Sequence, residues 1–193
     1  MKKILCVLLL LFTGCSSKTS MIEIQKHVYV EKEFKDSWLE TNEFGDSYIK
    51  EELQGGYHYH FDQQFLEIFF NTGGKIELYN YSIKKNDLII SGEMIPPKTI
   101  RLVHPHLDNV TSEGVIIHEL GHYFDEKHQF SSSKQFTKLY KKYRTLFNQK
   151  TKKEYFAECF KEYVGGHQEK VKPFHSYMKT ITQKIRQKNK WAM

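Results

Sequence analysis

Cysteine is scarce in this chain of 193 residues and occurs only at positions 6, 15 and 159. The first two lie in an N-terminal segment that we expect to be cleaved or lipidated, so Cys159 would be the only free thiol. No disulfide within the chain is therefore expected. The fold has to be held together by its hydrophobic core or by a metal ion.

Strong charge of one sign is also missing. The sequence holds 29 Lys and Arg against 23 Asp and Glu, and without its first fourteen residues the balance is 27 against 23, a net charge of +4. Proteins that bind nucleic acid normally carry a dense basic patch, so we expect no nucleic-acid partner. The sequence shows no internal repeat and no second composition regime, and we expect a single domain at residues 21–193.

Long apolar runs are absent except near the N-terminus. Two lysines precede nine apolar residues, 4–12, which are too few for a membrane-spanning helix of about 20 residues and are typical of a signal peptide. The stretch that ends in Cys15 resembles the lipobox of bacterial lipoproteins, in which the Cys is diacylated. This resemblance implies a signal peptide at residues 1–14, a polar tether at 15–20, and an extracytoplasmic chain anchored to a membrane by lipid on Cys15. The alternative is an ordinary cleaved signal in which Cys15 is coincidental.

The expected elements run from strands to helices. Residues 21–60 show only short alternating stretches that predict strands or turns, and apolar residues at helical spacing predict a helix over 61–71. Short strands are expected next, and helices follow in the second half. The expected strands are 75–81, 87–91 and 99–103, and the expected helices are about 111–127, 133–147, 151–164 and 173–191. This order predicts an α+β fold, with a small mixed sheet followed by a helical half.

A metal site is indicated by His118-Glu119-Leu120-Gly121-His122, an HExxH motif within an expected helix. Two histidines four residues apart lie on one face of a helix, so both imidazoles can bind one zinc ion while the intervening Glu lies beside its water ligand. Zinc lowers the pKa of that water to about 7, and a carboxylate can take up its proton as it attacks a carbonyl. The motif predicts His118 and His122 as ligands and Glu119 as the general base. The alternative is an exposed amphipathic helix that carries these residues by chance.

A second motif downstream offers a third ligand. In Glu154-Tyr155-Phe156-Ala157-Glu158 the two glutamates are one helical turn apart on a common face. One of them would bind zinc, while the other would accept a hydrogen bond from a ligand histidine and fix its orientation. The alternatives are two solvated glutamates on a lysine-rich helix, or four protein ligands around a structural zinc with no open position.

The two motifs together resemble the catalytic domain of the anthrax lethal factor-like metallopeptidases, a family that includes secreted Pro-Pro endopeptidases. The family pattern is HE-x-x-H-x-x-D followed by E-[YF]-F-A-E-x-F, and the resemblance covers roughly residues 98–190. It implies a zincin-like fold with one zinc ion, with Glu154 as the third ligand and Glu158 supporting the site from behind the ligands. It also implies that Asp125 orients a ligand or stabilises the end of the helix.

One position departs from the family pattern. Family members carry a Tyr seven residues before the zinc-binding Glu, and its hydroxyl is thought to hold the oxyanion of the tetrahedral intermediate. Here this position is Phe147, which cannot donate a hydrogen bond. Removing one oxyanion donor typically costs about 10²–10³ in rate. Tyr143, one turn earlier, is a candidate replacement and Tyr155 is another, although packing is the better interpretation of each. A slightly shifted chain path is a further alternative.

These observations predict a membrane-anchored zinc endopeptidase, a hydrolase that acts on proteins or peptides outside the cytoplasm. The expected strand at 99–103 is the candidate for pairing with an extended substrate. The alternative from another class is a lipoprotein that keeps the fold and serves as a non-catalytic binding or regulatory module, which Phe147 favours.

Other polar residues are expected to have ordinary roles. We expect His104 and His106 to be solvated, Glu162 to be a solvated carboxylate, and Cys159 to be buried as a small apolar side chain. The basic residues of the last helix either contact anionic lipid or wall polymer, or form the charged outer face of a packed helix.

Overall fold

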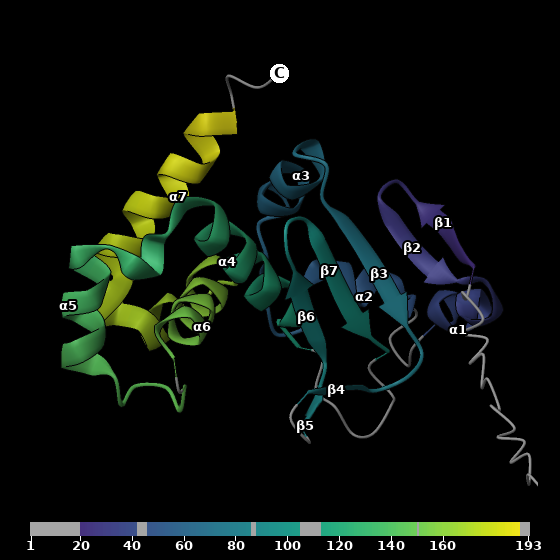
Figure 1. Cartoon of the computed structure of the whole chain (residues 1–193), viewed down its shortest axis with the longest axis horizontal. Coiled ribbons are helices and arrows are strands. Elements are labelled where there is room, and N and C mark those ends of the chain that lie inside the picture. The colour runs from purple at the N-terminus through teal and green to yellow at the C-terminus, as the bar shows by residue number, and fades with distance from the viewer. Residues whose placement is uncertain (1–19, 42–45, 86–87, 105–112, 150, 190–193) are drawn as a thin grey trace, which may run out of the picture.

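The computed structural model describes residues 20–41, 46–85, 88–104, 113–149 and 151–189 (Figure 1). The predicted signal peptide, the lipidation site Cys15 and the tether up to Thr19 lie outside these ranges. The described residues combine a small mixed sheet with a helical half, which confirms the expected α+β class. None of their helices is both long enough and apolar enough to cross a membrane.

Five strands form the main sheet in the order β1-β2-β3-β7-β6. They are β1 (Met21–Gln25), β2 (Val28–Glu31), β3 (Lys75–Tyr79), β7 (Thr99–Val103) and β6 (Gly92–Ile95). The three central strands are parallel, whereas β1 and β6 are antiparallel to their neighbours and form the two edges. A separate hairpin, β4 (Ile83–Lys85) and β5 (Leu88–Ile90), precedes β6 in the chain.

Strand β7 coincides with the expected strand 99–103. Strands β3 and β5 lie within the expected strands 75–81 and 87–91. It did not locate β6, whose four residues are all half-buried and therefore show no alternation between buried and exposed positions. Because β7 pairs with β3 on one side and with β6 on the other, its backbone groups are already used. The expectation that residues 99–103 pair with a substrate is therefore wrong, and β6 forms the sheet edge on this side.

Short helices accompany the sheet, and longer ones form the helical half. The helices are α1 (Lys35–Leu39), α2 (Tyr48–Gln54), α3 (Gln64–Asn71), α4 (Val115–His128), α5 (Lys134–Tyr143), α6 (Lys152–Val164) and α7 (His175–Asn189), with 3-10 turns η1 (Lys32–Phe34), η2 (Phe130–Ser132) and η3 (Gln168–Phe174). α6 agrees closely with the expected helix 151–164, whereas α4 begins at Val115, about four residues later than expected. α5 ends four residues earlier than expected, so Phe147 lies beyond it.

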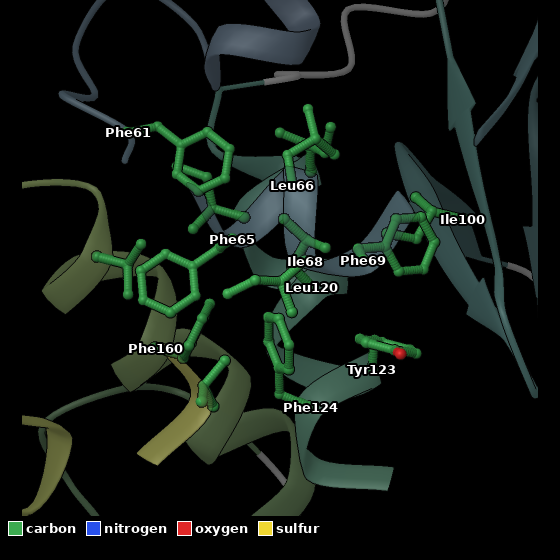
Figure 2. Close-up of a cluster of buried hydrophobic side chains, with 14 of the residues drawn as sticks. Phe61, Phe65, Leu66, Ile68, Phe69, Ile100, Leu120, Tyr123, Phe124 and Phe160 are labelled. Atoms are coloured by element: carbon green, nitrogen blue, oxygen red, sulfur yellow. The ribbon is translucent and has the colours of Figure 1, made fainter. Parts of the chain in front are cut away.

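α3 and α4 connect the sheet to the helical half through a core of aromatic side chains (Figure 2). The ring centroid of Phe65 in α3 lies 5.9 Å from that of Phe124 in α4 and 5.4 Å from that of Phe160 in α6. Phe69 packs edge-on against Tyr123, with centroids 4.9 Å apart. These contacts fix one face of α4 in the core and leave its other face for polar residues.

Candidate metal centre

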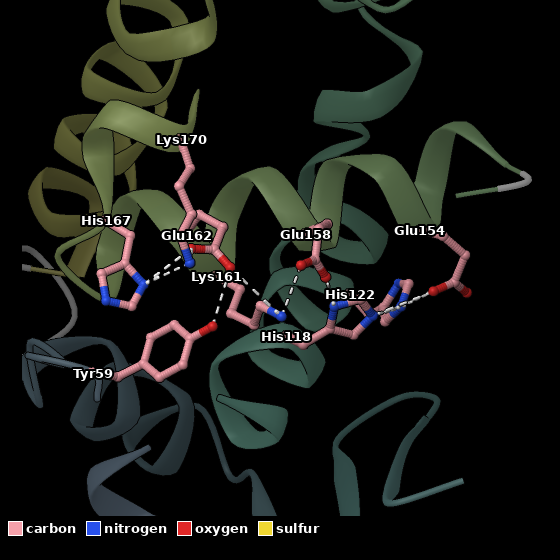
Figure 3. A network of polar contacts seen from close by, with 9 residues as sticks. All are labelled: Tyr59, His118, His122, Glu154, Glu158, Lys161, Glu162, His167 and Lys170. Carbon is pink, nitrogen blue, oxygen red and sulfur yellow. Dashed lines mark hydrogen bonds and ion pairs between the residues drawn. The ribbon is translucent and has the colours of Figure 1, made fainter. Parts of the chain in front are cut away.

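α4 holds the HExxH residues in a fixed orientation. Leu120 and Phe124 are buried in the core, so the helix cannot rotate without exposing them. His118 and His122, one turn apart on another face, both project toward α6 (Figure 3).

The close crossing of α4 and α6 depends on two small residues. A Cβ atom on Gly121 would lie 2.9 Å from the Cα atom of Ala157 and 3.3 Å from its Cβ, so a larger residue at this point would push the helices apart. Gly121 lies between the two histidines of the first motif, and Ala157 lies between the two glutamates of the second. The crossing therefore brings together two motifs that are 36 residues apart in the sequence.

Thr151 fixes the beginning of α6. Its side-chain Oγ1 accepts a hydrogen bond from the backbone N–H of Glu154, with a distance of 3.2 Å, as the N-cap of the helix. Glu154 consequently occupies the first turn, with its carboxylate directed toward the two histidines of α4, as Figure 3 shows.

Three possible metal ligands converge at this crossing. Nε2 of His118 and Nε2 of His122 are 3.1 Å apart, and each lies 3.2 Å from Oε2 of Glu154. These three atoms form a donor triangle. Hydrogen bonds alone leave one side of it unexplained, because two N–H groups that both donate to Glu154 place the two nitrogens 3.1 Å apart without a proton between them. Atoms 2.0–2.1 Å from a tetrahedral zinc ion are separated by about 3.3 Å, so the donor triangle fits such an ion. Within the described residues, no other cluster of His, Cys, Asp and Glu side chains converges in this way.

Glu158 contacts His118 from the other side of the imidazole. Its Oε2 lies 3.3 Å from Nδ1 of His118, and its Oε1 lies 2.7 Å from Nζ of Lys161. An Nδ1–H group that donates to Glu158 leaves the lone pair of Nε2 directed at the donor triangle. Burial by itself would raise the pKa of Glu158, but His118 and Lys161 outweigh it and hold the pKa below its usual value.

The ligand residues favour positive charge between them. Burial by itself would lower the pKa of His118, but hydrogen bonds with Glu154 and Glu158 outweigh it and raise the pKa to about 9. Hydrogen bonds from both histidines hold the pKa of Glu154 well below its usual range. The site therefore stabilises a cation at this position, whether a proton or a metal ion.

Glu119 lies on the wall of the same site and is only 6% exposed. Burial raises the pKa of its carboxyl group, which makes it a stronger proton acceptor than an exposed glutamate. The charges of His118 and His122 and the backbone N–H of Met94 oppose this rise without cancelling it.

A cavity of about 870 Å³ lies over the site. The edge strand β6 and the β4–β5 hairpin form one wall, and α4 and α6 form the other. The apolar residues of this lining include Ile89, Ile90, Met94, Pro96 and Val115. This volume is at the upper end of the range for ligand sites, which is roughly 300–1,000 Å³. The cavity runs beside the edge strand β6.

Asp125 takes the second of its two expected roles. Its carboxylate accepts hydrogen bonds from the backbone N–H and from the hydroxyl of Ser131, both at 2.6 Å. These bonds join the end of α4 to η2 and so stabilise the helix end.

The structure does not bring a candidate tyrosine to the position of an oxyanion donor. The ring of Tyr143 packs on Phe174, with centroids 6.1 Å apart, and the hydroxyl of Tyr155 donates to the backbone carbonyl of Tyr143. Phe147 packs on the ring of Tyr155, with centroids 5.3 Å apart. None of these aromatic residues lines the cavity.

Two residues that were expected to be solvated are buried. Glu162 accepts a hydrogen bond from the hydroxyl of Tyr59 at 3.0 Å (Figure 3). Nε2 of His104 lies 3.2 Å from the carbonyl oxygen of Ser37. Tyr59 precedes Glu162 by 103 residues, so no local pattern could have indicated this contact. His106 lies outside the described residues.

Comparison of the chain with protein-family models gives no match, and comparison with curated proteins gives none either. The interpretation of this site therefore depends on the residues and the geometry described above.

Proposed function

We propose that the chain is a zinc-dependent endopeptidase with a zincin-like fold, related to the anthrax lethal factor-like metallopeptidases. The observation that carries this proposal is the donor triangle of His118, His122 and Glu154, with Glu119 on the wall of the same cavity. Three protein ligands and a nearby carboxylate are the parts that a hydrolytic zinc site requires.

Each residue of the site has a defined task in this proposal. His118, His122 and Glu154 hold the ion, which when bound supplies the Lewis acidity that makes water nucleophilic at neutral pH and stabilises charge on a carbonyl oxygen. The Glu119 carboxylate accepts the proton of the attacking water and returns it to the departing amine.

The geometry favours a catalytic site over a purely structural one. Glu158 faces Nδ1 of His118, whereas the donor triangle forms at Nε2. Three protein ligands rather than four are therefore directed at the ion, and one position stays available for substrate or water.

The edge strand β6 is the proposed track for an extended peptide substrate. The backbone N–H of Val103 donates to the carbonyl of Ser91, so in this antiparallel pair the backbone groups of Gly92 and Met94 point away from β7. Both residues line the cavity. A peptide that adds to this edge would place its backbone beside Glu119 and the donor triangle.

A non-catalytic binding module is the second candidate, and one observation favours it. Among the described residues, no tyrosine lines the cavity, so the oxyanion donor that the resemblance implies is lacking. An enzyme without this donor would be slower by about 10²–10³. A binding module would hold peptides in the same cavity and release them unchanged.

We also propose that the protein acts outside the cytoplasm, anchored to a bacterial membrane through Cys15. The lipobox-like segment alone supports this proposal. Mass spectrometry of the mature protein should find an N-terminus at diacylated Cys15, and an unmodified mature N-terminus would refute the anchor.

Elemental analysis and a peptide library test the proposed activity together. The chain from Ser16 onward, which contains every described element, should hold one zinc ion and cut peptides. Glu119→Gln should keep the zinc and lose about 10²–10⁴ in turnover, whereas the control Glu126→Gln, an exposed residue on the same helix and cavity wall, should keep both. Stoichiometric zinc without cleavage in the unchanged protein would favour the binding module, and the lack of zinc binding would refute both candidates.

A further inference from the structure

The near balance of charge in the whole chain conceals a separation between its two halves. Residues 21–130 hold 10 Lys and Arg against 19 Asp and Glu, whereas residues 131–193 hold 16 against 4. The first part, which contains the sheet and α4, therefore carries a net charge of −9, and the part with α5, α6 and α7 carries +12.

α5 presents basic side chains to solvent without any acidic neighbour in the sequence. Residues 131–153 contain 8 Lys and Arg and no Asp or Glu. The exposed basic residues of this stretch include Lys134, Lys138, Lys141, Lys142 and Arg144. None of these five forms an ion pair with a residue that the structure describes, so their positive charges are not neutralised locally.

α7 adds to this basic surface. Residues 170–193 contain 7 Lys and Arg and no Asp or Glu, and Lys172, Lys179 and Lys184 are exposed without an ion pair to any described residue. The two helices meet near their first turns, where the rings of Phe136 and Tyr177 have centroids 5.5 Å apart. In Figure 1, α5 and α7 form the end of the molecule that is remote from β1.

The acidic residues of this half do not offset the basic surface. Glu154 and Glu158 belong to the metal site, and Glu162 is buried against Tyr59, which leaves Glu169 as the exposed acidic residue. No residue of α5 or α7 lines the cavity over the metal site. The basic surface is therefore separate from the substrate cavity, and one of its members, Lys184, lines a smaller cavity of about 400 Å³ with His128 and Phe130.

We propose that the basic surface, defined by Lys134, Lys138, Lys141, Lys142, Arg144, Lys172, Lys179 and Lys184, docks on anionic phospholipid headgroups. Basic residues spread over an outer helical face fit an extended negative surface, which attracts each nearby Lys or Arg. A lipid anchor on Cys15 would keep the whole molecule close to the membrane, because a tether of five residues spans at most roughly 17 Å. The anchored end carries the acidic half and is repelled by the headgroups, so the molecule would lie along the membrane with its basic end held down.

Vesicle binding by the chain from Ser16 onward tests this inference without the lipid. The protein should bind vesicles of phosphatidylcholine that contain about one third phosphatidylglycerol, should not bind pure phosphatidylcholine vesicles, and should dissociate at high salt. Replacing Lys134, Lys138, Lys141 and Lys142 together by Gln should weaken binding by about 100-fold or more, since each lysine contributes roughly fivefold.

A matched variant removes the same charge from the other half. Gln at Lys26, Lys32, Lys35 and Lys84, which are also exposed and unpaired among the described residues, should weaken vesicle binding by less than about threefold. Bound zinc and circular dichroism check that both variants fold, and Gln at Lys172, Lys179 and Lys184 serves as a second test if the α5 variant does not. Equal losses in the two halves, or a lack of binding to phosphatidylglycerol, would overturn the inference. Tighter binding to soluble polyphosphate or duplex DNA than to the vesicles would also overturn it, because the surface would then recognise a polymer.

Discussion

The carboxylate of Glu158 lies 3.3 Å from Nδ1 of His118, on the side of the imidazole that faces away from the donor triangle. Its other oxygen is 2.7 Å from Nζ of Lys161, whose side chain is only 16% exposed. This chain of contacts fixes the tautomer and the ring orientation of a proposed zinc ligand from a residue that does not touch the metal position.

Replacing Lys161 by Met should therefore weaken zinc binding. The substitution removes the ion pair that orients the Glu158 carboxylate. Without its cation in a largely buried place, the carboxylate turns toward solvent or takes up a proton, so it no longer holds the Nδ1–H of His118 in place. We expect a loss of about tenfold in zinc affinity, at the lower end of the range for residues behind metal ligands, measured by competition with a chromophoric chelator.

Two further variants decide whether the effect is specific. Lys161→Arg keeps the cation and should restore most of the affinity. Lys153→Met removes an exposed pair with Glu126 that touches no ligand, and it should change the affinity by less than about twofold. Equal losses in Lys161→Met and Lys153→Met would show that Lys161 has no special role.

Gly121 is the second point at which a small change should affect the metal site. A Cβ at this position meets the backbone of Ala157, which cannot move aside as a flexible side chain can. Overpacking of this kind costs about 1–3 kcal/mol, against a gain of roughly 1 kcal/mol from replacing Gly in a helix. We expect Gly121→Ala to lower the zinc affinity and Gly121→Val to lower both the affinity and the melting temperature further.

Comparison of Gly, Ala and Val at position 121 provides an internal control, because the effect should grow with the size of the side chain. Because the ligands lie on both helices, separation of α4 and α6 should widen the donor triangle in proportion to the added volume. A Gly121→Val protein with unchanged zinc affinity and unchanged melting temperature would contradict the tight crossing.

Cys159 gives a prediction for the pH dependence of stability. Its side chain is fully buried, as expected from the sequence, and burial together with the charges of Glu158 and Glu162 raises the pKa of the thiol far above its usual value of 9.0. Above pH 9 the unfolded chain loses this proton while the folded chain retains it, so the folded state binds more protons and its stability falls as the pH rises. The thiol contribution is complete below pH 9 and declines above it by up to about 1.4 kcal/mol per pH unit.

This contribution of the thiol can be measured by urea unfolding. The unchanged protein and Cys159→Ala are compared between pH 8 and 10. The free energy of unfolding should fall more steeply with pH in the unchanged protein, although Cys159→Ala is less stable at pH 8 because it leaves a small void. Buried tyrosines contribute to both proteins alike and cancel in the comparison. Parallel slopes would mean that the thiol ionises in the folded protein.

The sequence predicted those parts of the fold that depend on local patterns. The helices that carry His118 and Glu154 show both an apolar face and clear ends, and β7 has a compact run of strand-forming residues. The convergence of the ligands was also predictable, because the spacing within each motif fixes the side-chain directions once the helices cross.

Other features depend on contacts between distant segments. The sequence did not indicate β6, because an edge strand with four half-buried residues has no apolar face. Glu162 looked like one more solvated residue in a row with Glu154 and Glu158, and only the packing of Tyr59 against α6 buries it. The packing of Tyr143 depends on a distant segment as well, because its ring contacts Phe174, which follows it by 31 residues.

Tyr143 and Phe147 provide a last test of how the cavity works. The Tyr143 ring packs on Phe174 and the Phe147 ring on Tyr155, so neither reaches the cavity. Tyr143→Phe should therefore leave zinc binding unchanged and alter turnover by less than about twofold, whereas loss of a true oxyanion donor costs about 10²–10³. Phe147→Tyr should likewise give no gain, because the ring at this position packs on Tyr155 and does not line the cavity. A 100-fold fall in turnover of Tyr143→Phe at unchanged zinc content and stability would show that the α5–α6 segment rearranges to bring this hydroxyl over the site when a substrate binds.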